Sequence, residues 1–427
     1  MASTTATAGV ACEIKPIAED TVNVSAVRAL FPILEERAGV CFFDNASTTQ
    51  KPAEVIRVID EFYSKSCSNA GRASYRLSSQ TLQAIQNSRA QIAQLINARP
   101  EDVVFTSGAT DSLNTIALSW GLANLNDGDE IMLCMQDHKS AVLPWFNVKR
   151  ILAGFGKHIK IVPFEIHDVG DYDLRTIREG VSSKTRLIAM SHIHHVYGMD
   201  MEVSDIREIV GPDVIISLDS SQSVGHIPVD VKELDVDFVS FSGHKMFAGN
   251  GVGVLWVNEK RQPELNPVRV GGMGATLSAD GETEFCAPTL QDLLESGTPN
   301  IPSILSLVPA VEFILNVGVE NIAARLSNLT RYLYDKVREI PGVDFGPGPG
   351  RCGCPGGYGI LAFRIQELSV SDLGFMLDSE NILVRTGDHC VSKASEEDQY
   401  VRVSLQVYNT EEEIDAFIEV LEDSVCQ

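Results

Sequence analysis

The chain has 427 residues, of which 44% are hydrophobic and 22% are charged. This length predicts one large domain and a smaller one, and no apolar run is long enough to predict a membrane-spanning helix. Acidic residues outnumber basic ones by 58 to 34, which gives a net charge of −24. Such a surface repels nucleic-acid phosphates and anionic lipids, so we expect neither a nucleic-acid nor a membrane partner.

The nine cysteines are an odd number scattered through a long chain, which is not the pattern of a disulfide framework. They predict a reducing, cytoplasmic environment. Cys352 and Cys354 lack a second pair of ligands, so we expect no metal site. The first residues contain neither the apolar segment of a secretory signal nor the arginines of a transit peptide, and we expect a flexible tail over 1–20.

In chain order, residues 24–31 have the apolar spacing of one or two helical turns, and residues 41–43 predict a strand. Helices are predicted over 53–64 and 78–97. After these, short strands alternate with helices at 111–123 and 140–154; the strands are 103–106, 131–134, 159–162, 186–190, 214–218, 238–240 and 252–256. This alternation predicts a large α/β domain with a mostly parallel, seven-stranded sheet covered on both faces.

An apolar stretch over 301–340 predicts two helices that leave this sheet and open a smaller α+β domain. Its strands are predicted at 359–363, 382–385 and 401–405, and its last helix begins near 411, where Thr410 and Glu413 have the spacing of a capping box. We therefore expect four parts: a tail at 1–20, a segment at 21–40 that packs with the small domain, a large domain at 41–300 and a small domain at 301–427.

Polar residues follow several predicted strands of the large sheet, at the edge where ligands collect in such sheets. The run Thr106–Thr110 opens a helix whose free N–H groups and Thr110 hydroxyl could hold a phosphate, although a plain turn and cap has the same pattern. His138 could stack on a flat ring or simply cap a turn. Asp219 ends a buried strand and would need a partner such as a protonated ring nitrogen, unless it is a helix N-cap.

Lys245 ends the sequence Ser-Phe-Ser-Gly-His-Lys and precedes a glycine-spaced strand. A surface lysine would not require this setting. A phosphate cradle, a ring stacker, an acid for a ring nitrogen and a lysine for a Schiff base together specify pyridoxal 5′-phosphate (PLP).

Cys390 and Arg402 lie in the predicted small domain. Cys390 has polar neighbours, which favour an accessible loop with a reactive thiolate over the usual small buried side chain. Arg402 interrupts the apolar alternation of residues 401–405. It could bind a substrate carboxylate with both nitrogens, or face solvent on an edge strand.

The chain resembles the class V aminotransferases over about residues 24–424, and among them most resembles SUF-type cysteine desulfurases and selenocysteine lyases. The motifs that carry the resemblance are Phe43–Ala46, Thr106–Thr110, His138, Asp219 with Gln222, Ser242–Lys245, Glu295–Asn300 and Arg385–Cys390. It implies a homodimer with the aspartate-aminotransferase-like fold, which is fold type I of the PLP-dependent transferases.

The resemblance also implies roles for residues around the cofactor. Lys245 would form the Schiff base, Asp219 would pair with the pyridine nitrogen, Gln222 would bond the ring oxygen, and His138 would stack on the ring and shuttle protons. The phosphate would be held by Ala109, Thr110, Ser242 and His244, and by Thr298 of the neighbouring subunit.

On the substrate side, Arg402 would bind the carboxylate, and the resemblance adds Arg385, His195, Asn45 and Arg72. Cys390 would attack the sulfur of cysteine, giving alanine and a persulfide for transfer to an acceptor protein, as in iron–sulfur cluster assembly. The alternative is a related PLP enzyme that does not need Cys390: a selenocysteine lyase, another C–S lyase, an epimerase or an aminotransferase.

Three residues depart from the family pattern. His195 stands where an asparagine is usual, Gly71 replaces a histidine, and Asp388 replaces the first histidine of Arg-Thr-Gly-His-His-Cys. All three lie at or near the expected substrate side, so the cofactor is better defined than the substrate.

Overall fold

The computed structural model describes residues 21–71, 74–271, 276–277, 283–284, 287–348, 357–393 and 399–425. The predicted tail at 1–20 lies outside them, as do Arg72, Cys352 and Cys354.

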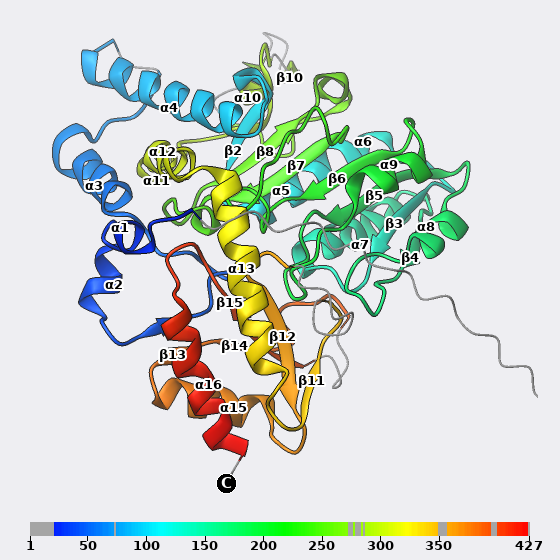
Figure 1. The fold of residues 1–427 in the computed structure, drawn as a ribbon. Helices are drawn as coiled ribbons and strands as arrows, with labels where there is room; N and C mark the ends of the chain where they lie inside the picture. The colour runs from blue at the N-terminus through cyan, green and yellow to red at the C-terminus, as the bar shows by residue number, and fades with distance from the viewer. Residues whose placement is uncertain are drawn as a thin grey trace, which may run out of the picture.

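The large sheet has seven strands in the order β2-β8-β7-β6-β5-β3-β4 (Figure 1). Pairs from β7 to β4 are parallel, whereas β8 runs antiparallel to both β7 and β2. All seven predicted strands are present, within one or two residues at most ends: β2 (Val103–Thr106), β3 (Glu130–Cys134), β4 (Lys160–Phe164), β5 (Thr185–Ser191), β6 (Ile215–Asp219), β7 (Phe238–Ser242) and β8 (Gly253–Val257).

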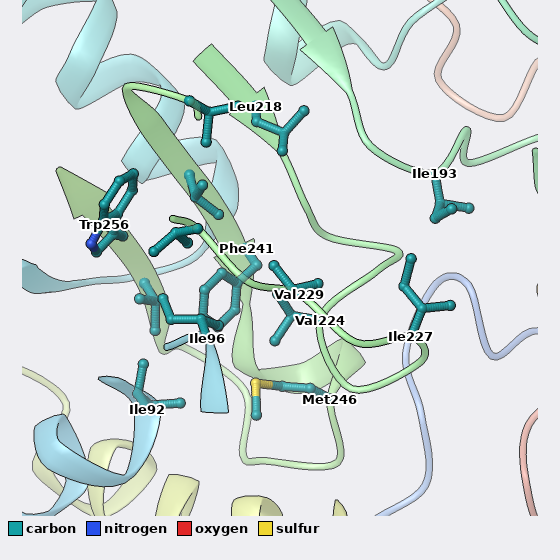
Figure 2. Close-up of a cluster of buried hydrophobic side chains, with 14 of the residues drawn as sticks. Ile92, Ile96, Ile193, Leu218, Val224, Ile227, Val229, Phe241, Met246 and Trp256 are labelled. Atoms are coloured by element: carbon teal, nitrogen blue, oxygen red, sulfur yellow. The ribbon is translucent and has the colours of Figure 1, made fainter. Parts of the chain in front are cut away.

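Helices cover both faces of this sheet because alternate side chains of each strand point to opposite sides. Phe241 of β7 and Trp256 of β8 share one buried cluster with Ile92 and Ile96 (Figure 2), whereas Phe238 of β7 belongs to the cluster on the other face. The first cluster includes residues of α4 (Arg76–Leu95), α8 (Leu174–Gly180), α9 (Val203–Val210) and α12 (Leu307–Val317); the second includes residues of α5 (Ala109–Ile116), α7 (Lys139–Gly154) and α10 (Leu290–Leu294).

The remaining elements of this part are short. The predicted helix at 53–64 is α3 (Ala53–Glu61) followed by a π-helical turn at Phe62–Ser66, and the one at 111–123 continues from α5 through a π-helical turn at Ala117–Gly121 into α6 (Leu122–Asn124). Three 3₁₀ turns lie at Pro100–Asp102, Gly243–Lys245 and Glu259–Glu264, and β9 (Thr276–Leu277) pairs with β10 (Thr283–Glu284).

A second, antiparallel sheet has the order β11-β12-β15-β14, below the first in Figure 1. Its strands are β11 (Val343–Phe345), β12 (Ile360–Ile365), β14 (Arg385–Gly387) and β15 (Tyr400–Ser404). Buried side chains of α13 (Val319–Val337), α15 (Val370–Ser379) and α16 (Glu411–Val425) pack with this sheet in one cluster. Beside it, β1 (Cys41–Phe42) pairs in parallel with β13 (Ile382–Leu383).

Helices α12 and α13 match, within a few residues, the two helices predicted in the stretch 301–340, and the short α11 (Ile301–Leu305) before them was not predicted. The chain turns at Gly318, where φ is 88°, a conformation that only glycine adopts readily. Both α11 and α12 pack against α3 and α4. The domain boundaries stay a prediction.

The N-terminal helices α1 (Val24–Arg28) and α2 (Pro32–Glu36) precede β1. Arg28 donates to the carbonyl of Tyr408 and forms an ion pair with Glu413, while the ring of Phe31 lies against Phe247 and Tyr408. The segment therefore contacts both the end of the chain and the loop after Lys245.

Within the described ranges, no helix taken alone has both the length and the apolar composition to cross a membrane. The stretch Ile301–Val317 meets that test only together with α13, and the two are bent by 73°.

Candidate active site

A cavity of about 220 Å³ lies at the carboxyl ends of β5, β6 and β7. These strands are parallel, so Ser191, Asp219 and Ser240 stand side by side at one edge. The cavity brings together eleven of the predicted site residues: Ala109, Thr110, His138, His195, Asp219, Gln222, Ser242, His244, Lys245, Arg385 and Arg402.

Lys245 reaches the cavity from the 3₁₀ turn that follows β7. Packing fixes this turn on both sides: the next side chain, Met246, is 1% exposed in the core (Figure 2), and a Cβ on Gly243 would lie 2.7 Å from Val252. Burial lowers the pKa of Lys245 to about 8, although the nearby Asp219 carboxylate opposes this shift. More of this amine is therefore neutral near physiological pH than of an ordinary lysine.

The first turn of α5 forms one side of the cavity. The backbone N–H of Ala109 donates to the hydroxyl of Ser242 at 2.8 Å, and the hydroxyls of Thr110 and Ser140 lie 2.8 Å apart. The helix start approaches β8 closely, since a Cβ on Gly253 would lie 2.4 Å from the backbone of Gly108. N–H groups and hydroxyls at a helix N-terminus form an anion site.

Asp219 and Gln222 also line the cavity. Asp219 is 8% exposed, and one of its oxygens accepts the N–H of Ser221. The amide of Gln222 donates to the carbonyl of Ala46 at 2.8 Å. A carboxylate this deeply buried is stabilised by a nearby cation, a role open to Lys245 or to a ligand.

His138 caps α7, and its Nδ1 accepts the N–H of Ser140. Burial, followed by the charge of Lys245, lowers the pKa of His138 to about 4, so the ring is neutral at physiological pH. The ring stands edge-on to that of His195, with centroids 5.1 Å apart.

His195 connects the cavity to the Cys390 loop. Its Nε2 lies 3.1 Å from the carbonyl of His389, and because a carbonyl can only accept, Nε2 carries the proton. Burial lowers the pKa of His195 well below its usual value, so the ring is neutral and Nδ1 is an acceptor. That Nδ1 is buried and has no hydrogen-bond partner within the described part of the chain.

Two arginines lie on the side of the cavity formed by the small sheet. Arg402 is 2% exposed and donates to the carbonyl of His195, to Asp44 and to Ser47, at 2.9 to 3.0 Å. Burial lowers its pKa to about 10, so it stays charged at neutral pH. Arg385 also donates to the Ser47 hydroxyl, at 3.0 Å. Two adjacent guanidinium groups are suited to binding a carboxylate.

Cys390 follows β14 in a partly exposed loop and is not among the residues that line the cavity. Its sulfur accepts a hydrogen bond from Nη2 of Arg385 at 3.2 Å. Arg385 also lines the cavity, so one side chain contacts both the thiol and the cavity.

The other predicted residues lie elsewhere. The buried Asn45 donates to the carbonyls of Phe42 and Ser404 and accepts from the hydroxyl of Tyr408. Thr298 is exposed, with Asn69 3.4 Å away. Arg72 lies outside the described residues. The functional roles of all three stay predictions.

Sequence reasoning missed several residues at the cavity, among them Ser47, Ser140 and His389. The signals were weak: Ser47 follows the strand and turn at 41–46, Ser140 follows His138, and His389 lies inside the motif that ends at Cys390.

The aminotransferase class-V family model matches residues 41–417. The chain belongs to this family. A curated relative from Escherichia coli O127:H6, named cysteine desulfurase, is 34% identical over 411 residues, which is 93% of this chain and 97% of the relative.

Solved structures give the same result and confirm the predicted fold class. The apo structure of a cysteine desulfurase from Thermococcus onnurineus NA1 is 30% identical and has a TM-score of 0.85, covering 94% of this chain and 98% of the other. The Escherichia coli cysteine desulfurase CsdA is 26% identical with a TM-score of 0.83, covering 95% and 99% of the two chains.

Proposed function

We propose that this protein is a PLP-dependent cysteine desulfurase, which removes the sulfur of L-cysteine, leaves L-alanine, and carries the sulfur on Cys390 to an acceptor protein. The observation that carries the proposal is the arrangement of Lys245 and Asp219 in one cavity with Arg385, whose guanidinium bonds the sulfur of Cys390. Relatives named cysteine desulfurase over 93% of the chain support it.

The residues of the cavity fit the cofactor. Lys245 supplies an amine for its aldehyde, the buried Asp219 would pair with its protonated ring nitrogen, and the neutral His138 would stack on the ring. Gln222 would bond the ring oxygen, and Ala109, Thr110, Ser242 and His244 would hold the phosphate at the start of α5. When bound, PLP supplies an electron sink that acidifies the α-carbon of an amino acid.

The chain's own groups would bind the substrate and move its protons. Arg402 and Arg385 would hold the carboxylate, and their shared hydrogen bonds to Ser47 fix the angle between them. With its pKa near 8, the Lys245 amine can take the proton from the α-carbon at Nζ. Nδ1 of the neutral His138 accepts the N–H of Ser140, so the ring proton lies on Nε2, and His138 can donate it from there to the substrate.

Cys390 would act as the nucleophile towards the substrate sulfur. A bond forms between Sγ of Cys390 and the sulfur of the substrate, the substrate's C–S bond breaks, and its electron pair stays on the substrate carbon. That carbon takes up a proton to become the methyl group of alanine. The products are alanine and a persulfide on Cys390, so atoms and electrons balance.

We also propose that two copies form a homodimer in which Thr298 contributes to the partner's phosphate site. Tyr63, Tyr75 and Leu82 are 64%, 52% and 37% exposed on the α3 and α4 side, which supports an apolar contact there. The described cysteines Cys41, Cys67, Cys134 and Cys390 are all free thiols, which supports a reducing compartment such as the cytoplasm.

The test is to incubate the purified holoenzyme separately with cysteine, selenocysteine and cysteine sulfinate, and to measure alanine. Cysteine should give alanine together with a persulfide on Cys390, identified by mass spectrometry. The C390A variant should lose alanine formation from cysteine while keeping the yellow colour of the bound cofactor.

Two outcomes would contradict the proposal. If C390A releases sulfide from cysteine at the full rate, the enzyme is another C–S lyase that does not use Cys390. If the wild-type protein has no chromophore that borohydride reduces onto Lys245, it does not bind PLP as an enzyme of this family does.

A further inference from the structure

The loop that carries Cys390, residues 388–393, is bonded along its backbone to the segment that leads into α7. Three hydrogen bonds join them: Lys139 N to Cys390 O at 2.9 Å, Ser392 N to Asp137 O at 3.1 Å, and Lys393 N to Met135 O at 3.0 Å. His138 and Val391 form an antiparallel bridge between the same two segments. The loop therefore lies directly against the residues that place His138 in the cavity.

The loop conformation is strained at its centre. His389 and Cys390 are consecutive residues other than glycine, and their φ angles are 49° and 64°. Side chains with a Cβ rarely adopt this region, so surrounding contacts must hold the two residues in it. A loop released from these contacts would leave this conformation and move the sulfur of Cys390 away from Arg385.

Asp388 makes two such contacts with a single carboxylate. Its Oδ1 accepts the backbone N–H of Cys390 at 3.1 Å, and its Oδ2 lies 3.0 Å from Nζ of Lys139. The N–H of Cys390 and then the Lys139 ammonium lower the pKa of Asp388. Both oxygens of the carboxylate therefore have partners: one accepts the backbone N–H of Cys390, and the other pairs with Lys139, the first residue of α7.

We propose that Asp388 is a positioning residue for Cys390: with Lys139, it holds the strained loop so that the sulfur points at Arg385 and the cavity. This proposal rests on the proposed function, in which the sulfur of Cys390 must reach a substrate in the cavity. The family pattern has a histidine at this position. A neutral imidazole could accept the Cys390 N–H, but only a carboxylate also pairs with the ammonium of Lys139.

The ion pair between Lys139 and Asp388 is roughly half exposed, with side chains 43% and 45% accessible. Pairs this exposed contribute little to global stability. Removing it should therefore leave the protein folded and loaded with cofactor, so that the effect on the loop can be measured alone.

The experiment measures how fast iodoacetamide alkylates Cys390 in the holoenzyme, by mass spectrometry of the Cys390 peptide, for D388A, D388N and K139M. We expect D388A to be alkylated about threefold to tenfold faster, the factor that corresponds to one lost hydrogen bond. D388N keeps an oxygen for the Cys390 N–H, and K139M removes only the ion pair, so both should show a smaller increase. The matched control is D378A, which removes an exposed aspartate on α15.

In the same variants, kcat for alanine formation should fall by a similar factor, with KM within about twofold, because the substrate contacts are untouched. The proposal would be overturned if D388A has the same Cys390 alkylation rate and the same kcat as the wild-type enzyme. So would a lower kcat accompanied by a raised KM and loss of bound cofactor, since that would indicate a general structural role. If the wild-type enzyme makes no alanine from cysteine, the proposed function fails, but the alkylation rates still decide the role of Asp388.

Discussion

Nη2 of Arg385 lies 3.2 Å from the sulfur of Cys390, while Nη1 of the same side chain lies 3.0 Å from the hydroxyl of Ser47. Ser47 also accepts from Arg402. The orientation of the thiol is thus coupled, through a planar group and one hydroxyl, to the arginine expected to bind the substrate carboxylate.

This geometry predicts that Arg385→Lys lowers kcat/KM for cysteine by about tenfold to a hundredfold, because an ammonium cannot donate to both partners in a fixed plane. The measurement is steady-state alanine formation. Arg178→Lys, on the exposed side of α8, is the matched control and should behave as wild type. Activity of Arg385→Lys within twofold of wild type would show that the double contact is not needed.

A second prediction concerns Lys245, whose pKa is lowered to about 8 by burial. In cofactor-free protein, the rate of reductive methylation of Lys245 should rise with pH with a midpoint near 8, whereas the midpoint of an ordinary lysine is about 10.4. Asp219→Asn should move the Lys245 midpoint to lower pH, because the carboxylate favours the charged amine. Peptide mass spectrometry gives the rates, and an ordinary midpoint at Lys245 would contradict the structure.

A third prediction concerns the free energy of unfolding at acid pH. Seven of the nine histidines have a lowered pKa, mainly because of burial: His138, His192, His194, His195, His226, His244 and His389. Between the unfolded value of 6.5 and folded values near 4, the unfolded chain binds protons that the folded chain does not. The contribution of these neutral histidines to the free energy of unfolding is therefore complete above pH 6.5 and is lost as the pH falls below it.

Each such histidine changes the free energy of unfolding by up to about 1.4 kcal/mol per pH unit in this window. Asp137 acts in the opposite direction, because burial raises its pKa to about 7. Urea unfolding at several pH values measures the slope. His226→Gln, which changes a buried histidine that does not line the cavity, should reduce the slope by one histidine's share. Unfolding that does not depend on pH from 7 to 5 would disprove the prediction.

The fourth prediction separates two roles for Asn45. Its buried side chain joins the carbonyls of Phe42 and Ser404 to the hydroxyl of Tyr408, so Asn45→Ala leaves buried groups without partners. We expect a loss of roughly 2 to 4 kcal/mol in the free energy of unfolding, measured in urea, with little change in KM. Wild-type stability with a raised KM would instead place Asn45 on the substrate.

The large sheet and the cofactor side of the cavity could be predicted because their signals are local. Each strand is a short apolar run, and the residues at its end, such as Asp219 and Lys245, are adjacent in sequence to that run. The short α11 was missed because the apolar composition continues from it into α12.

Arg385, Arg402 and His195 were predicted as site residues and line the cavity, but the contacts that hold them could not be predicted, because these contacts join distant parts of the chain. Asp44 and Ser47 meet Arg402 only because β1 pairs with β13 and Asp44 bridges to Ser404. The contact between Lys139 and Asp388 likewise spans 249 positions. Sequence periodicity describes one element at a time and contains no information on such pairs.

The pairing of β1 with β13 also sets when the cavity can form during synthesis. Strand β1 and Asp44 meet β13 and Ser404 only after nearly the whole chain has been made, and contacts of such large sequence separation form slowly. A nascent chain that ends before β15 would contain Lys245 but not Arg402, although both residues line the same cavity. The growing polypeptide therefore passes through a period in which Lys245 has been made but the arginine on the other side of its cavity has not.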